Sequence, residues 1–234
     1  MIAALLAAAP LHAAEERTND RRLMVMTIDS LAAVEGPAEV RQLNRKVLQA
    51  MREVPRHLLV PEEVRSQAYQ NKPLPIGHEQ TISQPYIVAL MTHLLRPKKD
   101  DVMLEVGTGS GYQAAVLSRL VRQVYSIEIV EPLATRAAAD LAKLGYENVT
   151  VRAGDGYAGW PEHAPFDGII VTAGAPHVPQ PLIDQLKPGA RMIIPVDIAP
   201  GRQMLRVIEK SKTGRVKRRD VTEVLFVPLV RSAG

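Results

Sequence analysis

Between residues 102 and 186 the chain alternates between short aliphatic segments and helical patterns. The aliphatic segments are residues 102–106, 123–127, 149–151 and 168–172, and the helical stretches are residues 112–120, 132–144 and 180–186. Strands that are joined through helices run parallel, and a parallel sheet needs helices on both of its faces. The aliphatic segments do not alternate strictly with polar residues, which fits strands that are buried on both sides. The sequence therefore predicts an α/β fold with a mostly parallel sheet.

Three further strand patterns follow, at residues 191–196, 204–209 and 221–227. They are joined by the short connections APGR and KSKTGRVKRRD, which contain no helical pattern. Short connections between neighbouring strands require antiparallel pairing. We interpret the basic run at residues 210–219 as a solvated hairpin turn and not as an RNA contact.

The part of the chain that precedes these patterns is helical. Residues 20–57 have helical periodicity with a break at Gly36-Pro37, and residues 86–95 form a second helical pattern. The chain shows no internal repeat and no low-complexity linker. We therefore expect one domain at 20–234, made of a helical cap with an active-site loop (20–97) and a cofactor-binding sheet (98–234).

The first residues, MIAALLAAAPLHAAEE, resemble a short signal sequence but lack a basic n-region. The apolar run is also too short to span a bilayer. We interpret residues 1–19 as a disordered or vestigial signal-like N-terminus, and we expect a cytoplasmic protein with no membrane partner. A periplasmic location is the alternative, if this stretch is an exported signal peptide.

Composition excludes several classes of chemistry. The 234 residues contain no cysteine, which rules out disulfides, thiolate metal sites and cysteine nucleophiles. The six histidines are scattered, and no two of them have the spacing of a His-Glu-x-x-His motif, so we expect no metal site. The net charge of +4 is modest and does not require a nucleic-acid partner.

A glycine-rich turn follows the first aliphatic segment, in LEVGTGSGYQAAVL. Glycines let the backbone turn tightly and approach a ligand at the start of a helix. A dinucleotide fingerprint would place its third glycine at position 112, which is a tyrosine here. The observed pattern, acidic-x-Gly-x-Gly-x-Gly, resembles motif I of S-adenosylmethionine-dependent methyltransferases. The residues that this resemblance assigns to the cofactor are Glu105, Gly107, Thr108, Gly109, Ser110 and Gly111.

Two further carboxylates follow later strands of the predicted sheet. Glu128 ends the second aliphatic segment, where a carboxylate can accept both hydroxyls of a ribose. Asp155 follows the third segment between Gly154 and Gly156, where it can bind an adenine amino group. Because such sheets bind ligands at the carboxyl ends of their strands, we expect these residues to bind S-adenosylmethionine.

The residues around the glycine turn restrict which chemical group can accept the methyl group. The chain has no Asn/Asp-Pro-Pro-Tyr/Phe sequence to hold an exocyclic amine, and without cysteine the covalent route to a pyrimidine carbon is closed. Residues 172–176 are small and weakly polar and contain no general base. A carboxylate acceptor needs no base, because it is already ionised at neutral pH and requires only alignment and exclusion of water.

The segments PLPIGHEQTISQPYIVALMTHLL and LEVGTGSGYQAAVL closely resemble the protein-L-isoaspartate O-methyltransferase family, as do MREVPRHLLVPE, LGYENVTVRAGDG, GWPEHAPFDGIIVTAGAP and VLFVPL. The resemblance runs from about residue 47 to residue 229. It implies a Rossmann-like class I methyltransferase fold. It also implies methyl transfer from S-adenosylmethionine to the α-carboxylate of L-isoaspartyl residues, with damaged proteins and peptides as partners. Separately from the resemblance, we expect a monomer. The family's catalytic serine maps onto Ser83, and Gln80, Thr81 and Ile82 map onto residues that line the cofactor and substrate pocket.

Ser83 allows two interpretations from the residues alone. Its hydroxyl can orient a carboxylate, but Ser-x-Pro before an apolar run is also a common helix N-cap. The resemblance favours the catalytic role. Two alternatives for the whole chain stay open: an RNA or small-molecule methyltransferase of the same fold, and a cofactor-binding protein without catalysis. Glu79 departs from the family pattern, which commonly has glycine at this position.

Overall fold

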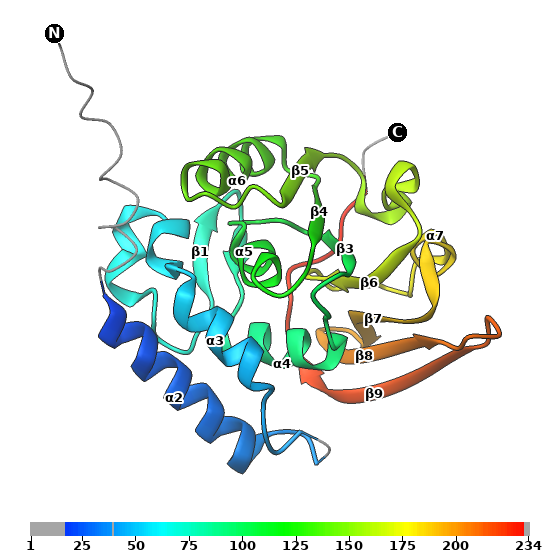
Figure 1. The fold of residues 1–234 in the computed structure, drawn as a ribbon, viewed down its shortest axis with the longest axis horizontal. Helices are drawn as coiled ribbons and strands as arrows, with labels where there is room; N and C mark the ends of the chain where they lie inside the picture. Colours follow the sequence, from blue (N-terminus) through cyan, green and yellow to red (C-terminus); the bar gives the residue numbers. More distant parts are fainter. Residues whose placement is uncertain (1–16, 39, 232–234) are drawn as a thin grey trace, which may run out of the picture.

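The computed structural model describes residues 17–38 and 40–231, which form a seven-stranded sheet packed between helices (Figure 1). The strand order is β5-β4-β3-β6-β7-β8-β9. The strands are β3 (Val102–Val106), β4 (Gln123–Glu128), β5 (Val149–Ala153), β6 (Phe166–Val171), β7 (Leu186–Ala199), β8 (Arg202–Lys210) and β9 (Val216–Val224). Apart from residues 17–19, the signal-like N-terminus that the sequence suggested lies outside the described residues.

The middle of the sheet is parallel. Strand β3 pairs in parallel with β4 on one side and with β6 on the other, and β5 and β7 extend the parallel pairing outward. The connections contain α5 (Tyr112–Ser118), α6 (Glu131–Lys143) and the short α7 (Gln180–Asp184). The predicted α/β fold with a mostly parallel sheet is therefore confirmed.

The last three strands are antiparallel, as the short connections indicate, but their boundaries differ from the prediction, and β9 ends at Val224 and not at residue 227. Strand β7 begins at Leu186, so the helix predicted at 180–186 ends earlier. Strand β9 begins at Val216 and not at residue 221, so half of the basic run is strand and the turn is limited to residues 211–215. Opposite charges stabilise this exposed edge across the strands, as in the ion pair between Arg206 Nε and Asp220 Oδ1 at 2.5 Å. The prediction relied on aliphatic residues, so it missed the first part of β9, which is rich in charged residues.

Both faces of the sheet are covered. Along β3, Met103 packs into a core shared with the N-terminal helices, whereas Leu104 packs into a second core that includes Leu182 of α7. The alternation continues in β6, where Ile169 and Ile170 point into opposite cores. Successive strand residues point to opposite faces, so strands between two cores must be apolar throughout, which explains the unbroken aliphatic segments.

Helices α2 (Thr18–Glu35), α3 (Arg45–Glu53) and α4 (Pro85–Leu95) lie together on one side of the sheet (Figure 1). The break predicted at Gly36-Pro37 separates α2 from α3. Apolar residues of all three helices belong to the same core as Met103, without a polar boundary between the cap and the sheet. This continuity supports our proposal that residues 20–234 form one domain.

A small hairpin precedes α4, and the sequence patterns did not predict it. Its strands β1 (Leu74–Gly77) and β2 (Gln80–Ile82) pair antiparallel. The two residues of its turn, His78 and Glu79, have φ angles of 52° and 58°. Two-residue turns of this left-handed form favour Asn and Gly, and strands this short carry little pattern, so the hairpin has no clear sequence signature.

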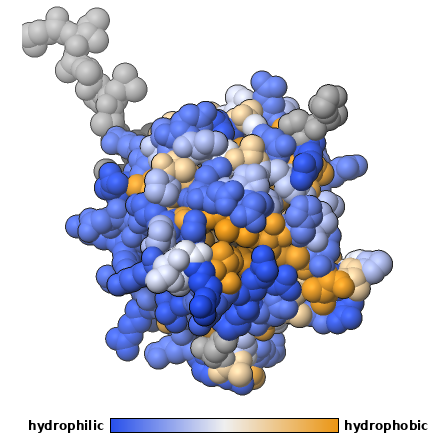
Figure 2. All heavy atoms as spheres, turned by 90° about the vertical axis from the view of Figure 1, so that its right-hand side faces the viewer, coloured by the Kyte–Doolittle hydropathy of each residue, from blue (hydrophilic) through white to orange (hydrophobic). Residues whose placement is uncertain are grey.

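The molecular surface is not uniformly polar. On the face that carries α7 and the tip of the β8–β9 hairpin, apolar residues gather in a central patch surrounded by polar residues (Figure 2). Within residues 17–38 and 40–231, none of the helices combines the length and the apolar character that crossing a bilayer requires.

Candidate active site

An open cavity lies at the carboxyl ends of β3, β4 and β6, and we call it the central cavity. Parallel sheets bind ligands at this edge. Four parts of the chain surround it: the glycine turn at 107–111, the residues after β4, the residues after β6, and two segments from outside the sheet. The lining residues are Gln80, Thr81, Ile82, Ser83, Val88, Val106, Gly107, Thr108, Gly109, Ser110, Tyr112, Gln113, Ile127, Glu128, Ile129, Val130, Gly156, Thr172, Ala173, Val227, Pro228, Leu229 and Val230.

At the glycine turn, backbone atoms without side chains line the cavity. Gly107 and Gly109 have φ angles of 97° and 53°, in the left-handed region that favours glycine. A Cβ atom on Gly107 would lie 2.5 Å from Oγ1 of Thr172, closer than any side chain allows. The turn is also anchored to the sheet, because the Gly107 N–H donates to the Ile127 carbonyl at 2.8 Å. Only glycine therefore fits at position 107.

Glu128 is the carboxylate that lines the central cavity. Its Oε2 accepts a hydrogen bond from the Gly109 N–H at 2.7 Å, and its Oε1 accepts one from the Val130 N–H at 3.0 Å. Only 6% of the residue is exposed. Because each carboxylate oxygen has a second lone pair, both oxygens can still accept a hydroxyl, in the manner expected for a ribose.

Glu105 lies behind the glycine turn and does not line the cavity. It is fully buried, and the Ser126 hydroxyl donates to its carboxyl group, while the Ser126 and Thr108 hydroxyls are 2.6 Å apart. Burial raises the pKa of the Glu105 carboxyl to about 8. The arrangement connects the carboxyl group to the turn through two hydroxyls. A direct contact of Glu105 with the cofactor stays a prediction.

The other residues that the sequence assigned to the cofactor separate into two groups. Gly156 lines the cavity, but Gly111, Gly154 and Asp155 do not. Gly111 is the N-cap residue of α5, and its backbone faces Leu141. Asp155 caps the short helix η3 (Gly156–Ala158), because its Oδ1 accepts the Tyr157 N–H at 2.8 Å. The adenine contact predicted for Asp155 therefore stays a prediction.

Residues 80–83 form one wall of the cavity, which we call the acceptor wall. Ser83 lies between β2 and α4, but it is not the helix cap, because Gln84 occupies that position. Instead, the Asn71 side chain accepts the Tyr86 N–H at 3.0 Å and so satisfies a free amide of the first turn of α4. Within the described chain the Ser83 hydroxyl makes no hydrogen bond, so it is available to a ligand.

A groove adjoins the acceptor wall, and we call it the adjoining groove. It shares Thr81, Ser83, Thr172 and Val227 with the central cavity. Its lining residues carry a single cation and a single anion, Arg202 and Glu223, and these two side chains form an ion pair. The remaining lining residues are apolar or neutral: Pro73, Gln84, Ile87, Gly201, Val224, Leu225 and Phe226.

The sequence reasoning left the segment 227–230 without a role, although VLFVPL belongs to the family resemblance. This segment, drawn in red in Figure 1, crosses the end of the sheet and lines the cavity. The Gly174 N–H donates to the Val227 carbonyl at 2.8 Å, the Leu229 N–H donates to the Gly174 carbonyl at 2.7 Å, and the Tyr157 hydroxyl donates to the Leu229 carbonyl at 3.1 Å. Hydrogen bonds to its backbone groups hold the segment in place, so its side chains carry no pattern from which its position could be predicted.

The donor set fits S-adenosylmethionine. A carboxylate faces the cavity, where it can accept ribose hydroxyls, and the glycine turn leaves space for a close backbone approach. Ile127, Ile129 and Val130 provide an apolar wall of the kind that a flat base needs. Glu128, the glycine turn and this wall would hold the cofactor.

Comparison with known proteins agrees with this fit. The family model for protein-L-isoaspartate(D-aspartate) O-methyltransferase matches residues 38–234. Protein-L-isoaspartate O-methyltransferase 2 of Syntrophobacter fumaroxidans is 60% identical over 187 residues, which cover 80% of this chain and 76% of that protein. Protein-L-isoaspartate O-methyltransferase 1 of Cupriavidus necator is 51% identical over 98% of this chain and 90% of its own length.

A solved structure named protein-L-isoaspartate O-methyltransferase superposes with a TM-score of 0.78 at 29% identity. The match covers 89% of this chain and 65% of that longer chain. The resemblance stated above therefore agrees with three findings: the match to the family model, the relatives at more than 50% identity and the shared fold. The chain belongs to the protein-L-isoaspartate(D-aspartate) O-methyltransferase family.

Proposed function

We propose that the protein transfers a methyl group from S-adenosylmethionine to the α-carboxylate of L-isoaspartyl residues in damaged proteins. The observation that carries this proposal is the position of Ser83, which lines both the central cavity and the adjoining groove. An acceptor that enters through the groove therefore meets this hydroxyl where the two spaces join. Family membership supports the same reaction.

S-adenosylmethionine, when bound, supplies a methyl group on a positively charged sulfur. The chain's own contribution is placement. Glu128 accepts the ribose hydroxyls and fixes the cofactor along the edge of the sheet, and the glycine turn leaves room for its amino-acid end. The segment 227–230 lines the cavity, where it would limit the access of water to the bound cofactor and so strengthen the attraction between sulfonium and carboxylate.

Ser83 orients the acceptor. Its hydroxyl donates a hydrogen bond to one oxygen of the substrate carboxylate and leaves the other oxygen to take up the methyl group. No general base is needed, because the carboxylate arrives ionised. A neutral donor suits this step better than a cation, which would hold the negative charge back. Gln80, Thr81 and Ile82 complete the wall beside it.

The adjoining groove favours a peptide over RNA. Its two charged lining residues are paired with each other, so the groove offers no unpaired cation to a phosphate backbone. Leu225 in the same groove is 81% exposed, and Phe226 lies next to it, which suits the apolar side chains of a polypeptide. Isoaspartyl-containing proteins and peptides are the substrates that fit.

The test uses a synthetic isoaspartyl peptide, its normal aspartyl twin and labelled S-adenosylmethionine. The proposal expects a base-labile methyl ester on the isoaspartyl peptide alone, followed by release of methanol as the ester closes to a succinimide. Labelled RNA without labelled peptide would support the RNA alternative. Calorimetric binding of the cofactor without transfer to any peptide would support the non-catalytic alternative.

Two further expectations from the sequence belong to this proposal. We propose that the protein acts as a monomer, because the groove and the cavity are complete within one chain. We also propose a cytoplasmic location, because its substrates are aged proteins and the chain carries no cysteine that an oxidising compartment would pair. Light scattering and cell fractionation measure these two properties.

A further inference from the structure

Arg56 is a buried charge that the proposed mechanism does not use. It lies in the short helix η1 (Arg56–Leu59) and is 0% exposed. Among the described residues no carboxylate pairs with it. Burial lowers the pKa of its guanidinium to about 10, so the group stays charged at neutral pH. A buried cation without a counter-ion is unfavourable unless its hydrogen bonds are satisfied, which points to a specific role.

The contacts of Arg56 are directed at the active site. Its Nε donates to the Ala68 carbonyl and its Nη2 donates to the Ser83 carbonyl, both at 2.8 Å. The guanidinium carbon lies 4.7 Å from the centre of the Tyr112 ring, within the range of a cation–π contact. Hydrogen bonds from a charged donor are roughly twice as strong as neutral ones. Nη1 has no hydrogen-bond partner in the described chain.

Two of these partners belong to different segments that line the central cavity. Ser83 ends the acceptor wall, and Tyr112 is the first residue of α5, directly after the glycine turn. One guanidinium therefore spans the acceptor wall and the helix that begins at the turn. Because the peptide group of residue 83 carries the carbonyl that Arg56 holds, the bond fixes the direction in which the Ser83 side chain leaves the backbone.

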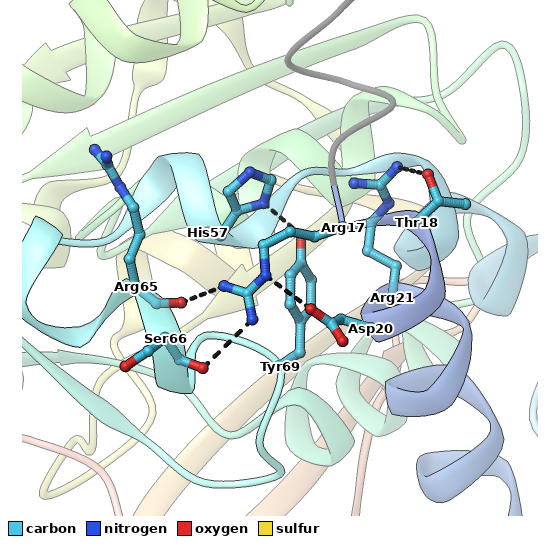
Figure 3. Close-up of polar contacts among 8 residues, drawn as sticks. All are labelled: Arg17, Thr18, Asp20, Arg21, His57, Arg65, Ser66 and Tyr69. Atoms are coloured by element: carbon cyan, nitrogen blue, oxygen red, sulfur yellow. Dashed lines mark hydrogen bonds and ion pairs between the residues drawn. The ribbon is translucent and has the colours of Figure 1, made fainter.

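The segment that carries Arg56 is also held by contacts that do not involve the central cavity. Figure 3 shows the imidazole of His57 directed at the Tyr69 hydroxyl, with 2.6 Å between Nδ1 and the oxygen. Arg17, at the start of α2, lies over the same tyrosine ring at 5.0 Å and donates to the carbonyls of Arg65 at 2.5 Å and Ser66 at 3.4 Å (Figure 3). Helix η1 thus rests on a polar frame that joins it to the N-terminal helix.

We propose that Arg56 is a positioning residue for methyl transfer, which holds the Ser83 backbone at a fixed place relative to the glycine turn. The inference rests on the proposed function, because it concerns the alignment of the same serine. Arg56 touches neither substrate nor cofactor in this account. Its effect passes through the Ser83 carbonyl and the Tyr112 ring, so a change at Arg56 alters turnover more than cofactor affinity.

The test compares Arg56→Met and Arg56→Lys. Methionine has a similar length, and because Arg56 has no carboxylate partner, its removal leaves no buried charge unpaired, so the variant is expected to fold. We expect Arg56→Met to lower kcat by about 100-fold, since a misplacement near 1 Å costs about that much. Arg56→Lys keeps a donor for one of the two carbonyls and should recover roughly tenfold of this loss. The affinity for S-adenosylhomocysteine, measured by calorimetry, should change by less than about threefold.

Two further variants separate an effect on positioning from an effect on stability. Lys210→Met removes another cation that backbone carbonyls hold, because its Nζ donates to the Leu186 carbonyl at 2.8 Å and to the Ile183 carbonyl at 3.0 Å, and Lys210 lines neither the central cavity nor the adjoining groove. It should lower the melting temperature as Arg56→Met does, but leave kcat within about twofold. In a Ser83→Ala background, Arg56→Met should cost less than about threefold in kcat, because the group that it positions is gone. Assays at 15 °C keep destabilised variants folded.

Additive losses of kcat in the double variant would overturn the inference, because Arg56 would then act independently of Ser83. Equal slowing by Lys210→Met, or a loss confined to S-adenosylhomocysteine affinity, would also overturn it. These results differ from failure of the proposed function. If the wild-type protein methylates no isoaspartyl peptide, both proposals fail, whereas an active wild type with additive variants rejects the positioning role alone.

Discussion

The two sides of the central cavity are built differently. The cofactor side comes mainly from one continuous stretch, in which β3, the glycine turn, α5 and β4 follow one another and Glu128 hydrogen-bonds back to Gly109. The acceptor side is assembled from three distant parts of the chain: residues 80–83, residues 172–173 and residues 227–230. The first side is determined by local sequence, whereas the second depends on long-range contacts such as the bond from Arg56 to Ser83.

This difference separates binding from turnover. Groups on the cofactor side contact a ligand that binds before any chemistry occurs, so their loss should appear in cofactor affinity. Groups on the acceptor side act on alignment in the transition state, so their loss should appear in kcat. Variants on the two sides should therefore give opposite kinetic patterns.

The largest expected effect is on the acceptor side. Ser83→Ala should lower kcat for an isoaspartyl peptide by about 100-fold, because the acceptor carboxylate loses its orienting donor. The affinity for S-adenosylhomocysteine and the melting temperature should stay near the wild-type values, because the hydroxyl makes no bond within the described protein and Gln84 occupies the cap position. Steady-state kinetics, calorimetry and thermal unfolding measure the three quantities.

A matched serine provides the control. Ser118 is buried and donates to the Ala115 carbonyl at 2.7 Å, outside the cavity. Ser118→Ala should lower the free energy of unfolding by about 1 kcal/mol and leave kcat unchanged. If Ser83→Ala behaved like Ser118→Ala, with lower stability and normal turnover, the acceptor side would have no catalytic serine.

The next effect is on the cofactor side. Glu128→Gln should weaken S-adenosylhomocysteine binding by about 10- to 100-fold, since hydrogen bonds to a charged group contribute about 1.5–3 kcal/mol. At saturating cofactor, kcat should fall much less. Glu131→Gln, which changes an exposed glutamate in the first turn of α6, is the control and should leave affinity unchanged. If Glu128→Gln instead lowered kcat and bound S-adenosylhomocysteine normally, the proposed difference between the two sides would be wrong.

Glu105 gives a pH-dependent effect behind the glycine turn. Burial raises its pKa from 4.5 to about 8, so between these values the folded protein holds a proton that the unfolded chain has released. The free energy of unfolding should therefore decrease as the pH rises from about 4.5 to about 8. Glu105→Gln should flatten this decrease, whereas the exposed-site control Glu147→Gln should keep it. Urea titrations at several pH values in this interval measure the free energy of unfolding. If the decrease with pH persisted in Glu105→Gln, groups other than Glu105 would be its cause.

The smallest effect concerns the acceptor side again. Glu79 occupies a turn position with a φ angle of 58°, which disfavours a side chain. Glu79→Gly should stabilise the protein by about 0.5–1 kcal/mol and leave kcat nearly unchanged, because Glu79 does not line the cavity. The matched change Glu63→Gly, in the short helix η2 (Glu62–Gln67), should destabilise it. Denaturant unfolding compares the two, and equal losses of stability would exclude strain at Glu79.

The same contrast explains how much could be predicted from the sequence. The parallel sheet, the glycine turn and Glu128 were predictable, because strand burial on both faces and a turn that excludes Cβ atoms leave local patterns. The β1–β2 hairpin and the segment 227–230 were not, because backbone hydrogen bonds hold them in place. Ser83 was assigned to the site through the family resemblance, since its local sequence also fits a helix cap.

The central claim is that a carboxylate acceptor meets the sulfonium at Ser83. The most direct measurement is a crystal structure with S-adenosylhomocysteine and an isoaspartyl peptide bound. The account predicts the sulfur in the central cavity, and a carboxylate oxygen of the peptide within about 3.2 Å of the Ser83 hydroxyl, on the side that faces the sulfur. A ligand bound elsewhere, or a Ser83 hydroxyl that points away from the sulfur, would contradict it.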